Sequence, residues 1–284
     1  MASRKCSGIL GGRPRRDAPT RTRERRRKGT AAADMTPKTH LTTRPIRAVL
    51  FDAVGTLFEV RGTVGELYRE IAVDFGSKAD ATSIQKSFIE YWEKVGQPTD
   101  KQSWELLVRW VFERVGPVED FGRFFETLYE AFRTDSTWEC CPETREVLRA
   151  LEAEEFPLGI VSNFDQRLPD VLGALDIDSF FSSITIPASC GYLKPDRRIF
   201  EHALRRLGVP AEETLFVGDH VIQDFQAAKE AGLRAVLIRR SGERADHTGT
   251  ISNLLEILPM LDVSTHSTTT RGFPLDGNSM EDLF

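Results

Sequence analysis

The chain has 284 residues, of which 40% are hydrophobic and 29% charged, a balance typical of a globular protein with a sizeable core. No stretch approaches the roughly 20 apolar residues that a membrane helix needs, so we expect no membrane span and no membrane partner. The four cysteines show no C-x-x-C spacing. We therefore expect neither a structural zinc site nor disulfides, and a reducing, cytoplasmic location.

The net charge of −5 is unevenly distributed along the chain. Residues 1–34 carry a net charge of +8 and the rest of the chain carries −13. Because the basic segment has few apolar residues, we predict that residues 1–43 are disordered. A nucleic-acid arm and a mitochondrial-type targeting segment are alternatives. We favour translation from Met35, because the ordered pattern begins soon after it, and we expect no nucleic-acid partner.

The first predicted element is a short apolar strand over 46–51, followed directly by Asp52. Beyond it, apolar residues recur with helical spacing and no strand pattern interrupts them. This region predicts four helices, over 64–75, 81–95, 102–115 and 119–133.

Aromatic residues are concentrated in this helical region, with 14 of the 26 Phe, Trp and Tyr residues between Arg61 and Trp138. Packing between helices is the default explanation, and an aromatic substrate pocket is the alternative. We interpret residues 61–139 as a helical cap inserted into an α/β domain. Two hinge segments, near 59–63 and 136–141, would let the cap open and close.

Strands and helices alternate after residue 140. Strands are predicted over 158–161, 183–186, 214–217 and 235–238, and helices over 143–154, 166–175, 196–207 and 222–231. This alternation predicts a doubly wound, Rossmann-like parallel sheet built from residues 44–60 and 140–262. Residues 263–284 are predicted to be a flexible tail.

Polar residues follow several of the predicted strands. In parallel sheets of this type, ligands bind beyond the carboxyl ends of the strands, so these side chains are expected to converge there. They are Asp52, Ser162, Asn163, Lys194, Asp219 and Asp224.

With these residues in this order, the sequence resembles the haloacid dehalogenase-like hydrolase superfamily. The matching segments are Phe51-Asp-Ala-Val-Gly-Thr-Leu-Phe58, Val161-Ser-Asn163, Lys194-Pro195 and Val217-Gly-Asp-His-Val-Ile-Gln-Asp224. The resemblance covers about residues 46–260, and the helical region lies where the superfamily carries its C1-type cap.

The resemblance implies a catalytic role for each matching residue. Asp52 would be a nucleophile that forms a covalent aspartyl ester, which water then hydrolyses. Thr56 and Ser162 would donate hydrogen bonds to the transferring group, and Asn163 would help to orient it. Lys194 would place a positive charge beside the developing negative charge.

The resemblance also implies a Mg²⁺ site. Asp219 would bind the ion together with Asp52 and the backbone carbonyl of Val54, and Asp224 would complete the acidic shell. Hard carboxylate and carbonyl oxygens suit Mg²⁺. The expected activity is therefore Mg²⁺-dependent hydrolysis of a small phosphorylated metabolite.

The sequence departs from the superfamily pattern at Val54. Phosphatases of the superfamily usually carry there a second Asp, which acts as general acid and base, and valine cannot transfer a proton. Such help is worth about 10²–10⁴-fold in rate. Glu59, Asp165 and His220 are close enough to the motifs in sequence to be candidate substitutes, although each is more often an ordinary loop residue.

Three alternatives remain open. A metal-independent 2-haloacid dehalogenase needs no acid at this position, because halide leaves without a proton. A binding protein could keep the fold and the ion without catalysis. A Schiff-base phosphonate hydrolase would need a cap lysine, for which Lys78, Lys86, Lys94 and Lys101 are available. Cys190 lies just before the Lys194 loop. We interpret it as a small hydrophobic residue, and a redox-sensitive thiol is the alternative.

Overall fold

The computed structural model describes residues 45–240 and 249–264. The predicted basic arm, the start at Met35 and most of the predicted tail lie outside these residues. None of the helices in the described ranges combines the length and the hydropathy needed to cross a bilayer.

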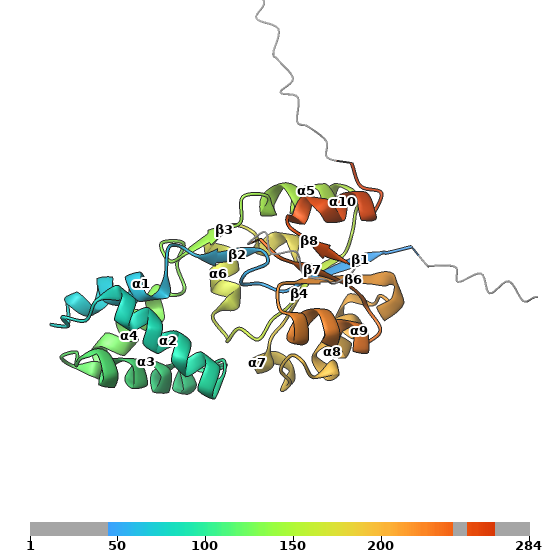
Figure 1. Cartoon of the computed structure of the whole chain (residues 1–284). Coiled ribbons are helices and arrows are strands. Elements are labelled where there is room, and N and C mark those ends of the chain that lie inside the picture. Colours follow the sequence, from blue (N-terminus) through green and yellow to red (C-terminus); the bar gives the residue numbers. More distant parts are fainter. Residues whose placement is uncertain (1–44, 241–248, 265–284) are drawn as a thin grey trace, which may run out of the picture. The chain divides into compact units, whose positions relative to one another are not determined.

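A six-stranded sheet forms the centre of the fold, as Figure 1 shows. All of its strand pairs are parallel, in the order β5-β4-β1-β6-β7-β8. The strands are β1 (Ala48–Phe51), β4 (Leu158–Val161), β5 (Ser183–Thr185), β6 (Thr214–Gly218), β7 (Arg234–Ile238) and β8 (Thr250–Ile251). The predicted α/β parallel sheet is confirmed; β8, only two residues long, was too short to recognise from its pattern.

The central strand β1 is apolar along its whole length because it is covered on both faces. Val49 lies opposite Leu158 of β4 and Leu215 of β6. Side chains alternate between the faces, so Val49 and Phe51 join one hydrophobic cluster while Leu50 joins another. This pairing places the ends of β4, β1 and β6 side by side.

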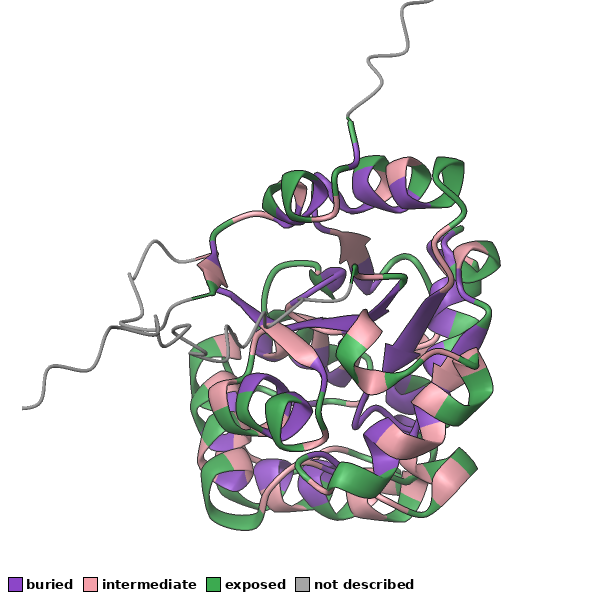
Figure 2. Cartoon of the chain, turned by 90° about the vertical axis from the view of Figure 1, so that its right-hand side faces the viewer, coloured by how far each residue is buried: buried purple, intermediate pink, exposed green. Residues whose placement is uncertain are grey.

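Helices cover both faces of the sheet, and Figure 2 shows their exposed outer surfaces around the buried strands. The cluster that contains Val49 and Phe51 is the larger one. It receives apolar residues from α5 (Thr144–Ala153), α6 (Leu168–Ala174) and α10 (Ile257–Met260). On the opposite face pack α8 (Arg197–Leu207) and α9 (Ala227–Glu230). The remaining short elements are η1 (Asp178–Phe180), α7 (Pro187–Cys190), η2 (Ala211–Glu213) and η4 (Leu254–Glu256).

Four helices within residues 61–137 have a hydrophobic core of their own (blue to green in Figure 1). They are α1 (Val64–Val73), α2 (Ala81–Val95), α3 (Lys101–Val115) and α4 (Phe121–Ala131), close to the predicted ranges. Each begins after a residue whose side-chain oxygen accepts a backbone N–H, namely Thr63, Asp80, Asp100 and Asp120. We refer to these four helices as the cap.

The two segments predicted as hinges are partly strands. β2 (Phe58–Val60) and β3 (Trp138–Cys140) pair antiparallel and form a two-stranded ribbon at the two ends of the cap. Three residues are too few to show the alternation by which a strand is recognised in sequence. Val263, which we assigned to the tail, is buried in the larger cluster of the core.

The last predicted helix also differs from expectation. Its first part is a π-helical turn, η3 (Val221–Gln226), and only α9 is α-helical. The wider turn accompanies the position of Asp224, whose carboxylate Oδ2 accepts the backbone N–H of His220 at 2.9 Å. Single π-helical turns of this kind occur frequently at functional sites.

Candidate active site

The predicted site residues converge at the carboxyl edge of the sheet, as their sequence positions required. Asp52 follows β1, Ser162 and Asn163 follow β4, and Asp219 follows β6. The backbone N–H of Asp52 donates to the carbonyl of Val217, so the ends of β1 and β6 are held together at this edge.

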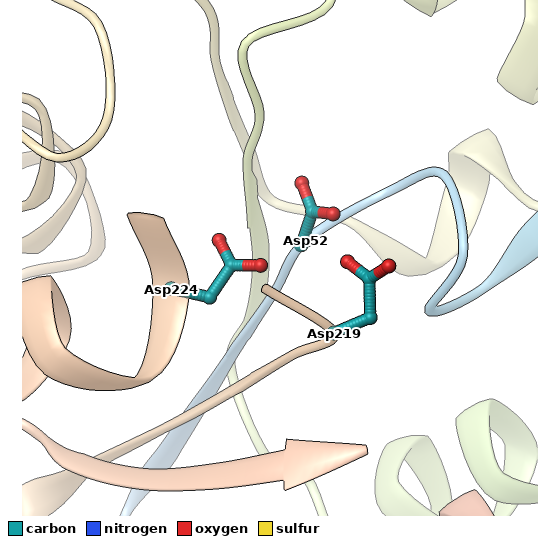
Figure 3. A group of neighbouring side chains, drawn as sticks. All are labelled: Asp52, Asp219 and Asp224. Carbon is teal, nitrogen blue, oxygen red and sulfur yellow. The ribbon is translucent and has the colours of Figure 1, made fainter. Parts of the chain in front are cut away.

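Three carboxylates form an acidic cluster, as Figure 3 shows. Asp52, Asp219 and Asp224 each offer an oxygen, and these oxygens lie within 4.8 Å of one another. Lys194 Nζ lies 2.6 Å from Asp52 Oδ1 and 2.6 Å from Asp224 Oδ1. One buried ammonium therefore faces three carboxylates, which leaves a surplus of negative charge.

This surplus shifts the protonation equilibria of the cluster. Burial, together with the charges of Asp52 and Asp224, raises the pKa of Asp219 to about 7. Burial is also the main cause that raises the pKa of Asp52, with Lys194 opposing the shift. Burial alone would lower the pKa of Lys194, but the carboxylates of Asp224 and Asp52 outweigh it and raise that pKa. A cation in the cluster would offset the remaining repulsion.

Two glycines make room for the acidic cluster. A Cβ on Gly55, whose φ is +82°, would lie 2.5 Å from Asp219 Oδ2. A Cβ on Gly218 would lie 2.5 Å from the carboxyl carbon of Asp224. Both aspartates can pack against the backbone at these positions only because no side chain is present there.

Asn163 holds the Lys194 loop. Its Oδ1 accepts the backbone N–H of Lys194 at 2.7 Å, and its Nδ2 donates to the carbonyl of Lys194 at 2.9 Å. The same Nδ2 donates to Gln223 Oε1 at 3.2 Å. Asn163 thus acts on the position of the lysine. Gln223 was missed from the sequence, although it lies between Asp219 and Asp224 in the last motif.

The two predicted hydroxyl donors are placed differently. Ser162 is buried and lines the same cavity as Asp52. Thr56 is completely buried and is not among the residues that line this cavity. Its hydroxyl has no hydrogen-bond partner within the described ranges, while its carbonyl accepts from Arg240 Nη2 at 2.7 Å. The predicted role of Thr56 toward a substrate stays a prediction.

A cavity of about 350 Å³ lies between the acidic cluster and the cap. Asp52, Lys194 and Asp219 line one end of it, and Val54 lines it as well. Val54 is half-buried and packs against the larger core cluster. The position that carries an acid in related phosphatases therefore presents an aliphatic side chain here, and the role of the Val54 carbonyl as a ligand stays a prediction.

Of the three candidate substitute acids, only His220 lines the cavity. Asp165 is fully buried and bound by Arg167 Nη2 at 2.7 Å, and it does not line the cavity. Glu59 is exposed on β2 and lies opposite Glu139. His220 lines the cavity, but its Nδ1 accepts two backbone N–H groups, so in this arrangement only its Nε2 can carry a proton.

The Schiff-base phosphonate hydrolase and the redox-sensitive thiol, two alternatives left open by the sequence, gain no support. None of the four cap lysines, Lys78, Lys86, Lys94 and Lys101, lines the cavity in the described part of the chain. Cys190 is half-buried, and its Sγ donates to the carbonyl of Ile186. Cys140, Cys141 and Cys190 are free thiols.

The aromatic residues of the cap pack between its helices as expected, and their role as a substrate pocket stays a prediction. Many pack in the core of the cap, and several also line the cavity beside the acidic cluster. The aromatic members of the lining are Tyr68, Phe88, Trp92, Trp104, Phe125, Tyr129, Phe132, Trp138 and Phe164. Helical spacing could not separate the two roles, because they fall on the same helices.

Comparison with known proteins agrees with this geometry. Residues 46–232 match a family model described as haloacid dehalogenase-like hydrolase. The chain is 32% identical to the zebrafish (Danio rerio) haloacid dehalogenase-like hydrolase domain-containing protein 3 over 216 residues, which cover 72% of this chain and 89% of that protein. It is 26% identical to glyceraldehyde 3-phosphate phosphatase of Methanothermobacter thermautotrophicus, with 77% and 97% covered.

A search of solved structures found the same fold. The crystal structure of a dehalogenase is 25% identical, with a TM-score of 0.59 and coverage of 76% of this chain and 97% of that chain. The family model and the zebrafish relative therefore identify a hydrolase: the chain belongs to the haloacid dehalogenase-like hydrolase family.

Proposed function

We propose that this protein is a Mg²⁺-dependent phosphohydrolase that acts on a small phosphorylated molecule through an aspartyl-phosphate intermediate on Asp52. The observation that carries the proposal is the cluster of three carboxylates with a single ammonium among them. A dehalogenase mechanism has no use for a divalent cation and would gain nothing from this surplus charge. The similarity to a glyceraldehyde 3-phosphate phosphatase supports the same choice.

The residues of the cluster fit Mg²⁺. Asp52, Asp219 and Asp224 offer hard carboxylate oxygens that converge on one point, and the Val54 carbonyl would add a neutral oxygen. When bound, the ion would neutralise charge on the phosphoryl oxygens and reduce their repulsion from the Asp52 carboxylate. Lys194 would supply a second, fixed positive charge on the same side of the site.

The proposed reaction has two steps. In the first, an Asp52 carboxylate oxygen attacks phosphorus, the bond to the ester oxygen breaks, and the alcohol leaves as its anion and takes a proton from water. In the second, water attacks the phosphorus of the aspartyl phosphate. The bond to Asp52 breaks, the water's proton passes to solvent, and inorganic phosphate leaves with the carboxylate restored.

Both steps lack the usual proton donor and acceptor, because Val54 lines the site at the position where related phosphatases carry an aspartate. Turnover should therefore be slow for esters of ordinary alcohols, by as much as about 10²–10⁴-fold relative to an enzyme that has the acid. Buried Ser162 and Lys194 remain able to hold the transferring group.

A 2-haloacid dehalogenase is the second candidate, and Val54 is the observation that favours it. There the Asp52 carboxylate would displace halide from carbon, and no acid would be needed because halide is a stable anion. The 25% identity to a solved dehalogenase is compatible with this reaction.

Replacing Asp52 by Asn tests the proposal, since it removes the nucleophile and preserves the shape of the side chain. We expect the wild-type protein to release phosphate from p-nitrophenyl phosphate only with Mg²⁺. We expect Asp52→Asn to lower that rate by at least about 100-fold, which is the effect typical of removing a general acid–base or a nucleophile. Phosphate release is measured by a colorimetric assay, with thermal melting as the control for folding.

The same assay separates the alternatives. Chloride release from 2-chloropropionate without metal, abolished in Asp52→Asn, would replace the proposal by the dehalogenase reaction. Absence of both activities, with Mg²⁺ still raising the melting temperature, would indicate a binding protein.

A further inference from the structure

We infer that the organic group of the substrate is a flat, apolar aromatic ring bonded directly to the phosphate, so that the substrate is an aryl phosphate. This inference rests on the proposed function and adds to it the class of the leaving group. Two independent features point to it, the lining of the cavity and the side chain at Val54.

The cavity has two chemically different ends. Toward the sheet it is lined by charged and polar groups, among them Asp52, Ser162 and Lys194. Toward the cap it is lined by aromatic rings and aliphatic side chains, including Phe88, Trp92 and Trp104. A ligand that fits both ends has a phosphate at one end and an apolar body at the other, and the volume of about 350 Å³ suits a small molecule.

Within the described ranges, no charged side chain of the cap lines this cavity. The one guanidinium in the lining, Arg167, is already bound: Nε and Nη2 donate to Asp165, and Nη1 donates to the Tyr129 carbonyl. The polar groups of the cap in this lining are few, among them Gln97, the hydroxyls of Tyr68 and Tyr129, and Trp104 Nε1. A sugar phosphate has more hydroxyls than these groups can match, and each hydroxyl left unmatched against the rings costs about 1–3 kcal/mol. A ring would bury only carbon there and stack on the aromatic side chains.

The side chain at Val54 favours an aromatic leaving group on separate grounds. When the ester bond breaks, the electron pair stays on the ester oxygen. An alkoxide needs a proton as it forms, whereas a phenol has a pKa near 10 and its anion is far more stable in water. An aryloxide can therefore leave without an acid and take its proton from water afterwards. A long alkyl phosphate would fit the apolar end but would still need the missing acid.

The test compares phosphate release from four esters with Mg²⁺. Phenyl and 2-naphthyl phosphate release phenols of similar acidity and differ in ring area, hexyl phosphate is apolar with a poor leaving group, and glucose 6-phosphate is polar. We expect kcat/KM to be highest for 2-naphthyl phosphate, on the order of tenfold above phenyl phosphate because of the extra buried ring. We expect hexyl and glucose esters to be the slowest.

A matched pair of variants on α3 tests the contribution of the pocket. Trp104 lines the cavity and Trp110 does not, although both are half-buried in the cap. We expect Trp104→Leu to lower kcat/KM for 2-naphthyl phosphate by about three- to tenfold, mainly through KM, and Trp110→Leu to have little effect. Phe88→Leu serves as a second cavity variant if Trp104→Leu fails to fold.

Val54→Asp tests the contribution of the leaving group. Restoring an acid should raise the rate with hexyl phosphate by about 10²-fold or more, and the rate with the aryl phosphates much less.

The possible failures are distinguishable. If the wild-type protein shows no phosphate release that depends on Mg²⁺ and on Asp52, the proposed function itself is refuted. If that release persists, the inference alone is overturned by a higher kcat/KM for glucose 6-phosphate, by equal effects of Trp104→Leu and Trp110→Leu, or by equal gains for hexyl and aryl esters in Val54→Asp.

Discussion

At the scale of single residues, the acidic cluster is the feature on which the proposed chemistry rests. Three carboxylates within 4.8 Å of one another repel, and Lys194 offsets only part of this repulsion through Asp52 and Asp224. Asp219 makes no ion pair with Lys194, and burial raises its pKa to about 7. A proton and a metal ion should therefore compete for this carboxylate.

The competition predicts how Mg²⁺ stabilises the protein at different pH. The folded-state pKa of Asp219 lies above its ordinary value of 3.8. The stabilisation that its protonated form contributes to the folded state is therefore present at low pH and is lost as the pH rises through about 7. Mg²⁺ must displace that proton at pH 6 but not at pH 8. We expect about 5 mM Mg²⁺, a concentration that exceeds the dissociation constant of a weak site, to raise the melting temperature more at pH 8 than at pH 6.

Asp219→Asn is the control for this prediction, because an amide keeps the shape and cannot bind a proton in this range. The variant should show a much smaller Mg²⁺ effect at both pH values. An equal Mg²⁺ effect at pH 6 and pH 8 in the wild type would contradict the assignment of Asp219 as a ligand.

At the scale of elements, the loop between β4 and α6 connects the sheet to the cap. Arg167 donates to Asp165 within this loop and to the Tyr129 carbonyl at the end of α4. Its guanidinium also lies 3.8 Å from the centroid of the Tyr129 ring. The Arg167 and Asp165 side chains are 3% and 0% exposed, so neither can rely on water for solvation.

Removing one partner of this buried pair predicts a large loss of stability. Arg167→Met leaves the Asp165 carboxylate buried without its cation, which costs about 3–5 kcal/mol of unfolding free energy. Replacing Asp165 by Asn in the same protein removes the stranded charge and should recover part of the loss. Urea denaturation of both variants measures the difference.

An exposed ion pair provides the comparison. Arg197 pairs with Glu201 on α8, and its side chain is 70% exposed, so Arg197→Met should change stability little. If Arg167→Met is as mild as Arg197→Met, the loop does not depend on the buried pair.

At the scale of the whole molecule, the folded unit contains its own hydrophobic clusters. In the part of the chain that the structure describes, three such clusters lie within residues 46–263, one on each face of the sheet and one in the cap. The physical requirements for folding are therefore met without the basic N-terminal segment.

This predicts the outcome of a truncation. A chain that starts at residue 43 should melt within about 2 °C of the full chain, less than the shift that 1 kcal/mol produces in a domain of this size. The proposed release of phosphate should also proceed at an unchanged rate. A clear loss in either, measured by calorimetry and by phosphate release, would assign a structural role to the basic segment.

Much of the fold could be predicted from the sequence because the signals are local. The run before Asp52 predicts a strand by its apolar composition, and the residues around Trp104 predict a helix by their spacing. The order of polar residues after the strands identified the family. The short strands β2, β3 and β8 were missed because two or three residues carry no period, and they form only when a partner strand supplies hydrogen bonds.

Local signals in the sequence therefore predicted the class of fold, the family and the candidate site residues Asp52, Lys194 and Asp219, because each depends on residue types at short spacing. Which side chains meet depends on the tertiary structure. It places Lys194 between Asp52 and Asp224, directs Asp165 to Arg167, and brings aromatic rings of the cap to one cavity beside Val54. These contacts join segments far apart in the chain, and their distances depend on packing that no local pattern specifies.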